Sequence, residues 1–193
     1  DDARDSAAGS RCREMVSGLE SASAYVIRCS ADFIIQGFTT ARYAEVAKQL
    51  NDKDASGDPV ARMMGFMAFN DTDEVVRAFA DCQRTELPGM MRFAAIAKTA
   101  TTIADLAGQL GSVGLSGMSP ADMETALTNL LPGGANTSPA NNTTVGNLVL
   151  ELNGIYCVGS LNDAQKDVCG PIQSAITNSG GDAQQIGSLF LDI

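Results

Sequence analysis

Residues 88–110, PGMMRFAAIAKTATTIADLAGQL, carry apolar side chains at steps of three and four. This spacing lines one face of an α-helix, and Pro88 suits the first turn of such a helix. The face is rich in alanine, which lets neighbouring helices pack closely. The segment therefore predicts a long central helix. Its inward positions are Met90, Phe93, Ala94, Ala97, Ala100, Ile103, Ala104, Ala107 and Leu110.

The same period predicts a second long helix over residues 10–36, which Gly37 ends. If this helix is continuous, Cys12 and Cys29 lie about 25 Å apart along its axis. A disulfide needs Cα atoms within about 7 Å, so these two cysteines are not expected to bond each other. The apolar stripe of this helix consists of Cys12, Met15, Val16, Leu19, Ala22, Val26, Cys29 and Phe33.

Shorter helices are predicted along the rest of the chain, with polar loops at 51–59 and 132–144. The helix expected over 162–178 is interrupted at Gly170–Pro171, where glycine and proline follow each other. The other short helices are expected over 40–50, 60–69, 72–82, 119–131 and 145–157. The apolar tail Ile186–Ile193 is expected to dock on another surface.

The pattern predicts an all-α fold, an irregular bundle of six to seven helices with two long central ones. We expect a single domain over residues 1–193, stapled by one or two disulfides. Gly111, Gly114 and Gly117 break the helical pattern and suggest a sub-boundary near 111–118.

The five cysteines are spaced widely, and none forms a C-x-x-C motif that would indicate zinc or redox chemistry. Cys157 and Cys169 flank a predicted turn, so we expect them to staple two helices. Cys29 and Cys82 lie on apolar helix faces and form the second expected pair. Cys12 is then the odd cysteine, available for an intermolecular bond.

The composition excludes several functional classes. A formal net charge of −10 disfavours nucleic acid and anionic membranes as partners. The absence of histidine excludes Ser-His-Asp triads, Cys-His pairs and imidazole metal ligands. No apolar run approaches the length of a membrane span. We therefore expect a protein that is not an enzyme and needs no cofactor.

Glycosylation sequons occur at Asn70, Asn136, Asn141 and Asn142. Together with the widely spaced cysteines, they favour a secreted, extracellular glycoprotein with disulfide bonds. The alternative is a cytosolic helical protein with buried thiols.

A short acidic segment resembles the first half of the EF-hand calcium loop. Asp52, Asp54 and Ser56 stand at the first, third and fifth positions of that loop, and Gly57 stands at its turn. The resemblance implies oxygen ligands for calcium. It covers seven residues, because Met63 stands where the family has a bidentate glutamate. We expect weak calcium binding at most; an acidic loop between helices is the alternative.

The distribution of charge suggests a function. From Thr99 onward the chain has one basic residue, Lys166, and eight acidic ones, yet it holds 13 of the 19 glycines. Removing water from a surface with so few charges costs little free energy, so we expect another copy of the chain to cover it. The function predicted first is self-association into an extracellular assembly or surface coat, with Leu189 and Leu191 in the contact. A surface of Ser, Thr, Asn and glycan is the simpler explanation.

The alternative function is a monomeric extracellular carrier. Methionines at helical spacing can line a pliable pocket for an apolar ligand, although they often only fill a core. The expected cavity is lined by methionine and alanine. The methionines concerned are Met63, Met64, Met67, Met90, Met91 and Met123.

Overall fold

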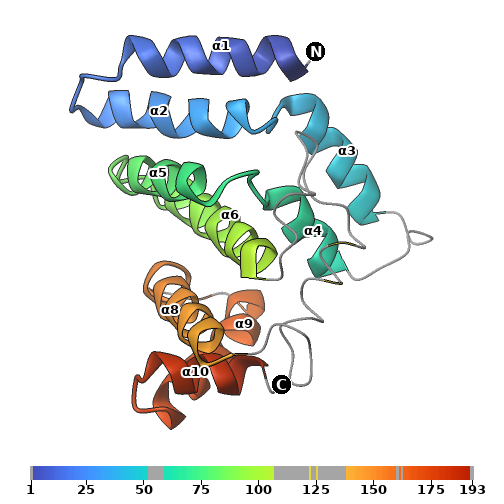
Figure 1. The fold of residues 1–193 in the computed structure, drawn as a ribbon, viewed down its shortest axis with the longest axis vertical. Coiled ribbons are helices and arrows are strands. Elements are labelled where there is room, and N and C mark those ends of the chain that lie inside the picture. Colours follow the sequence, from blue (N-terminus) through green and yellow to red (C-terminus); the bar gives the residue numbers. More distant parts are fainter. Residues whose placement is uncertain are drawn as a thin grey trace. The chain divides into compact units, whose positions relative to one another are not determined.

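The computed structural model describes residues 2–51, 59–106, 122, 125, 138–159, 161 and 163–191. Within these residues it contains nine α-helices and no strand (Figure 1). The predicted all-α fold is confirmed. Nine helices exceed the expected six or seven because one predicted long helix is two, and because the apolar tail is itself helical.

The chain divides into two compact units, Asp1–Thr125 and Ala126–Ile193. Each unit has its own packed helices. The expectation of one domain over 1–193 stays a prediction. The sub-boundary expected near 111–118 and almost all of the helix expected over 119–131 lie outside the described residues.

The first unit is a stack of six described helices. α1 packs on α2, α2 on α5, and α5 on α6, while α4 also contacts α6 (Figure 1). Their bounds are α1 Asp2–Met15, α2 Ala22–Ile35, α3 Thr40–Asn51, α4 Pro59–Met67, α5 Thr72–Gln83 and α6 Pro88–Leu106.

The predicted continuous helix over 10–36 is wrong, because it breaks into the hairpin of α1 and α2. Ser21 begins α2 as its N-cap, and its hydroxyl accepts a hydrogen bond from the Ala24 amide at 3.2 Å. The exposed Gly18 lies in the turn between the two helices. A capping serine and a glycine together end one helix and begin the next.

The core of the first unit follows the predicted helix faces. In α6 the alanines at 94, 97, 100 and 104 are all buried. In α5, Val75, Phe79 and Cys82 are buried, and Val76 of the same predicted stripe is 49% exposed. The small side chains of α6 therefore supply a close-packing surface, as the sequence predicted.

The second unit consists of α8 (Pro139–Tyr156), α9 (Asp163–Asn178) and α10 (Ala183–Leu191). α8 packs against both α9 and α10. Pro171 lies inside α9, so the predicted interruption at Gly170–Pro171 is wrong. Pro171 and Gly170 are both exposed, so the helix continues with the proline ring on its outer side.

The start of α8 differs from the prediction. The polar loop predicted over 132–144 ends at Ser138, because α8 begins at Pro139 rather than at 145. The Ser138 hydroxyl accepts a hydrogen bond from the Asn141 amide at 3.1 Å, and Pro139 occupies the first turn. Residues 132–137 of the predicted loop lie outside the described residues.

Both predicted disulfides are present. Cys29–Cys82 joins α2 to α5, and Cys157–Cys169 joins the end of α8 to α9. Cys12 is unbonded and exposed on α1. In the part of the chain that the structure describes, no helix combines the length and the apolar character needed to cross a membrane.

Candidate functional site

The end of α2 positions the first two side chains of the candidate site. Gly37 has a φ of +83°, which glycine adopts without strain, and its amide donates to the Ile34 carbonyl at 3.0 Å. The Phe38 amide donates to the Phe33 carbonyl at 3.0 Å. These two hydrogen bonds form a Schellman motif, which brings the residue after the glycine back onto the last turn of the helix. Phe33 and Phe38 therefore pack edge to face, with ring centroids 5.1 Å apart.

Further aromatic rings gather on this pair. Phe93 of α6 lies 4.7 Å from Phe33 and 5.9 Å from Phe38, measured between ring centroids. Tyr43 of α3 lies 6.0 Å from Phe93 and 6.4 Å from Phe38. Separations of 4.5–7 Å are those of interacting aromatic pairs. Three helices and one helix end thus converge on a single aromatic cluster.

Arg42 fixes α3 against this cluster. Its guanidinium donates to the carbonyls of Gln36 at 3.0 Å and of Phe66 at 3.1 Å. The guanidinium carbon also lies 5.1 Å from the Phe38 ring centroid and 4.8 Å from that of Phe66. These contacts are cation–π interactions. They hold the first turn of α3, and with it Tyr43, beside the end of α2.

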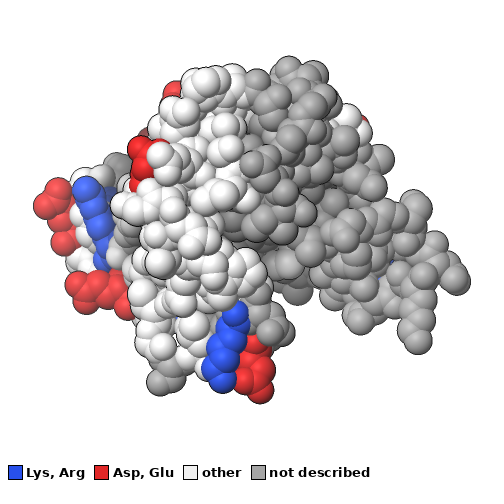
Figure 2. Space-filling view, turned by 90° about the horizontal axis from the view of Figure 1, so that it is seen from below, with Lys and Arg blue, Asp and Glu red and all other residues white. Residues whose placement is uncertain are grey.

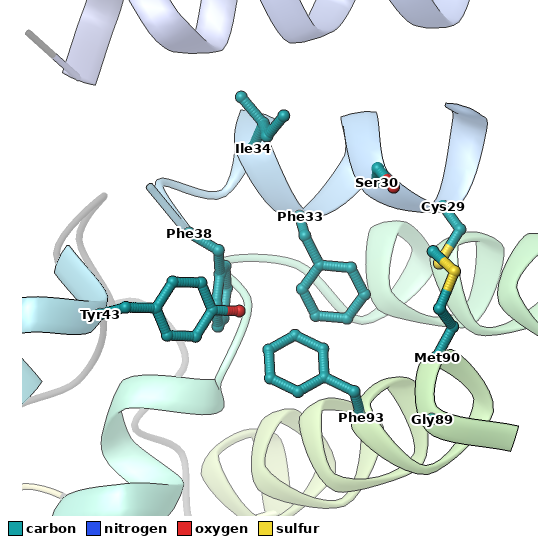
Figure 3. Close-up of a pocket in the computed structure, with 9 residues that line it drawn as sticks. All are labelled: Cys29, Ser30, Phe33, Ile34, Phe38, Tyr43, Gly89, Met90 and Phe93. Carbon is teal, nitrogen blue, oxygen red and sulfur yellow. The ribbon is translucent and has the colours of Figure 1, made fainter. Parts of the chain in front are cut away.

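The cluster lines an open pocket with a volume of about 400 Å³ (Figure 3). Its walls come from α2, the α2 end, α3 and the first turns of α6, and they are mainly aromatic. Of the described residues that line it, none carries a charge. The lining residues are Cys29, Ser30, Phe33, Ile34, Phe38, Tyr43, Gly89, Met90 and Phe93.

Two hydroxyl groups border this aromatic pocket. The Tyr43 ring lies beside Phe38, and its oxygen points toward the Phe33 and Phe93 rings (Figure 3). Burial raises the pKa of Tyr43 to about 12, although the positive charge of Arg42 acts in the opposite direction. The phenol is therefore neutral and protonated at physiological pH. Ser30 supplies the second hydroxyl, on the α2 wall.

The described lining of the pocket has no charged side chain and no free thiol. Cys29 is committed to its disulfide, and no carboxylate or cationic side chain stands among the described lining residues. A neutral, mainly apolar cavity with one or two hydroxyls is typical of a binding site for a small apolar molecule.

A second cavity of the first unit, about 390 Å³ in volume, is polar instead. Asp81, one of its lining residues, pairs with Arg28 at 3.2 Å and with Arg13 at 3.4 Å. Arg13 also pairs with the buried Asp32 at 2.7 Å. Arg77 reaches Asp32 at 3.5 Å. These ion pairs link α1, α2 and α5, so the network helps to hold the three helices together. The cavity is lined by Arg13, Ser17, Gly18, Glu20, Tyr25, Arg28, Arg77, Ala80, Asp81 and Arg84.

The aromatic pocket does not have the methionine and alanine lining that was predicted for a carrier cavity, and that lining stays a prediction. Met90 alone of the five described methionines in that prediction lines the aromatic pocket. Met67 is buried in the core and Met63 is 42% exposed. The alanines of α6 are used in helix packing, and Met123 lies outside the described residues. The aromatic site was not predicted from the sequence. Phe33 and Phe38 nevertheless lie on either side of Gly37, the residue that was predicted to end the helix.

The other predicted sites are dispersed. The calcium candidates Asp52, Asp54 and Ser56, and the sequon at Asn136, lie outside the described residues. Among the residues that are described, no group of three or more His, Cys, Asp or Glu could hold a metal ion.

The remaining sequons and the predicted contact residues are placed by the structure. Asn141 and Asn142 lie in the first turns of α8 rather than in a loop, and Asn70 precedes the Asp71 cap of α5. Leu189 is 39% exposed on α10, and Leu191 is the last residue of that helix.

No protein-family model matches the chain, and no curated protein or solved structure is similar enough to it to indicate a family or a function.

Proposed function

We propose that this protein is a secreted, non-enzymatic binding protein that holds one small, neutral, apolar molecule in the aromatic pocket of its first unit. The observation that carries the proposal is the cavity of about 400 Å³ between Phe33, Phe38, Tyr43 and Phe93, with no charge among its described lining residues.

The size and lining of the pocket support this choice. Ligand sites in proteins are typically cavities of roughly 300–1,000 Å³ with mostly apolar walls and a few polar groups. Transfer of apolar surface from water into such a cavity is favourable by roughly 25 cal/mol per Å². Flat aromatic rings at the walls favour a ligand that is itself flat or ring-shaped, since offset and edge-to-face contacts add to burial.

The pocket is also anchored on several sides. The Cys29–Cys82 disulfide fixes α2 to α5 at one wall, and the Schellman motif fixes Phe38 beside Phe33. Arg42 fixes the start of α3. A preformed site avoids the entropy of ordering its walls on binding, which favours affinity. The two disulfides also support an extracellular location.

A fluorescence titration tests the proposal. N-phenyl-1-naphthylamine, a neutral probe that fluoresces in apolar surroundings, should bind the full chain saturably with one site. A Cβ at Gly89 would meet open space, and Gly89 lines the pocket, so the variant Gly89→Leu should fill the cavity and weaken probe binding.

Gly154→Leu is the matched control. Gly154 is also an exposed helical glycine with open space around it, but it lies in α8 of the second unit. It should bind the probe as the wild type does. The proposal is overturned if wild type shows no saturable binding, or if the two variants lose affinity equally.

We propose self-association through the charge-poor C-terminal part as a second candidate function. Val158, Val168 and Leu189 are large apolar residues there with 51%, 49% and 39% exposure. Charged side chains occupy little of the described surface on the face drawn in Figure 2. Sedimentation of wild type at micromolar concentration should show an oligomer, and Leu189→Asp with Leu191→Asp should dissociate it. A wild-type monomer under non-reducing conditions would eliminate this candidate.

A further inference from the structure

The wall of the aromatic pocket contains a hydrogen-bond donor, the Tyr43 hydroxyl. Tyr43 is only half-buried, with 41% of its surface exposed, so water can reach this residue when the pocket is empty. Its ring contacts Phe38, Phe66 and Phe93, and its oxygen points into the ring cluster (Figure 3). A ligand oxygen that replaces water at this hydroxyl forms a hydrogen bond with a net favourable free energy, which strengthens binding by up to about tenfold.

The direction of that hydrogen bond follows from the protonation state. Burial raises the pKa of Tyr43 to about 12, so the phenol keeps its proton at physiological pH. A neutral phenol is a good donor. The matching group on the ligand is therefore an acceptor oxygen.

The charge of the ligand is limited by its surroundings. The guanidinium of Arg42 already lies over the Phe38 and Phe66 rings, so a cationic ligand would meet a like charge next to Tyr43. An anionic ligand would be buried without a cation among the described lining residues, which is unfavourable. A neutral ligand avoids both penalties.

Resting on the proposed function, we infer that the pocket selects neutral aromatic ligands that carry a carbonyl or ether oxygen, and that the Tyr43 hydroxyl donates a hydrogen bond to this oxygen. Tyr43 is thus a specificity-determining residue, and the remaining rings supply binding without selecting this oxygen.

A pair of nearly isosteric ligands separates the contribution of the Tyr43 hydrogen bond from that of the apolar contacts with the rings. 2-Acetylnaphthalene carries a ketone oxygen where 2-ethylnaphthalene carries hydrogens. Dissociation constants for both are measured by displacement of N-phenyl-1-naphthylamine from wild type and from Tyr43→Phe. We expect Tyr43→Phe to weaken binding of the ketone roughly tenfold and to change binding of the hydrocarbon by less than about twofold.

A spectroscopic measurement gives a second readout. Hydrogen bonding lowers the C=O stretching frequency, so bound 2-acetylnaphthalene should show a lower frequency in wild type than in Tyr43→Phe. Tyr25→Phe, at a tyrosine of the polar cavity, is the matched control and should leave both measurements unchanged.

The outcomes distinguish the inference from the proposed function. If both naphthalenes bind wild type but Tyr43→Phe affects them equally, the inference is overturned and the binding function stands. The same holds if the C=O frequency is identical in wild type and Tyr43→Phe. If neither ligand binds wild type, both the inference and the proposed function are overturned.

Discussion

A Cβ atom at Gly187 of α10 would lie 1.8 Å from the carbonyl oxygen of Asn142 in α8. The contact is reciprocal, because a Cβ atom at Gly146 of α8 would lie 1.7 Å from the carbonyl oxygen of Ala183 in α10. Each helix therefore presents one glycine to the backbone of the other. The two helices approach so closely that no side chain fits at either position.

Gly187→Ala and Gly146→Ala are expected to destabilise the second unit. Each added methyl group must push α8 and α10 apart, and overpacking of this kind lowers the free energy of unfolding by about 1–3 kcal/mol or more. Amide hydrogen exchange of residues 138–191 measures the effect locally.

Gly154→Ala is the control for this prediction. Gly154 is in the same helix, but a Cβ there meets nothing within 4 Å. Alanine is the better helix former by up to about 1 kcal/mol, so this variant should be slightly more stable than wild type. Equal behaviour of Gly154→Ala and Gly187→Ala would contradict the close approach.

Arg28→Met is expected to destabilise the first unit strongly. Arg28 is 7% exposed, pairs with Asp81, and donates to the carbonyls of Val16, Ser17 and Leu19 in the α1–α2 turn. Without the guanidinium, the three carbonyls of the turn lose their hydrogen-bond donor. The buried carboxylate of Asp81 also loses one of its cationic partners. Removal of one member of a buried pair lowers the free energy of unfolding by about 3–5 kcal/mol.

Two comparisons make the Arg28 prediction specific. Arg28→Lys should recover only part of the stability, because an ammonium cannot reach the carboxylate and the carbonyls as a planar fork does. Lys166→Met removes an exposed pair with Asp163 and should change stability little. Urea unfolding of the three variants gives the ranking, and an Arg28→Met as stable as Lys166→Met would refute the role.

The sequence predicted the helical class and both disulfides because both depend on short-range pattern. The stripe of Val75, Phe79 and Cys82 identifies the inner face of α5, and Cys29 lies on the matching face of α2. The predicted separation of Cys12 and Cys29 used a continuous helix that does not exist. The pairing was still correct, since Cys29 bonds Cys82.

The errors occurred where one local signal competed with another. The apolar stripe continued across residues 16–21, so the periodic pattern did not reveal that Ser21 is the N-cap at which α2 begins. At the start of α8 the Asn- and Thr-rich composition suggested a loop, although Ser138-Pro139 is a helix-start signal.

The pocket could not be predicted from the sequence for a different reason. Phe33 and Phe38 come from α2 and its end, Tyr43 from α3 and Phe93 from α6, so the convergence of these rings depends on tertiary packing. The local part was readable in principle, because a glycine that ends a helix often brings the next residue back onto the last turn. The methionines suggested a pocket lining because several of them occur at helical spacing. Which of them lines the aromatic pocket depends on its position in the packed fold.

The buried Asp32 should make stability depend on pH. It is 1% exposed, and its Oδ2 atom has no hydrogen-bond partner among the described residues. Burial raises its pKa above 3.8, with a smaller contribution from the Asp81 charge, while Arg13 and Arg77 lower it. The folded state therefore binds this proton more tightly than the unfolded state. The resulting stabilisation is complete below pH 3.8 and is lost as the pH rises through the folded pKa.

Asp32→Asn tests the sign of this effect, because asparagine does not titrate. The free energy of unfolding of wild type minus that of Asp32→Asn should fall as the pH rises from about 3 to 7. Asp105→Asn, at an exposed position of α6, should give a flatter difference. A difference that rises with pH would mean that the arginines, rather than burial, control the Asp32 carboxyl.

The two disulfides should contribute unequally to stability and to ligand binding. Cys29–Cys82 closes a separation of 53 residues and Cys157–Cys169 one of 12. Because the entropy removed from the unfolded chain grows with loop length, replacing each pair by alanines should lower the free energy of unfolding by about 4 and about 3 kcal/mol, respectively.

Only the first replacement loosens the α2 wall of the aromatic pocket, so only Cys29→Ala with Cys82→Ala should also weaken binding of N-phenyl-1-naphthylamine. Amide exchange measured separately in each unit, with a probe titration of both variants, checks the two effects. Equal loss of probe binding in the two variants would mean that the disulfide acts on the whole chain rather than on the pocket wall that it anchors.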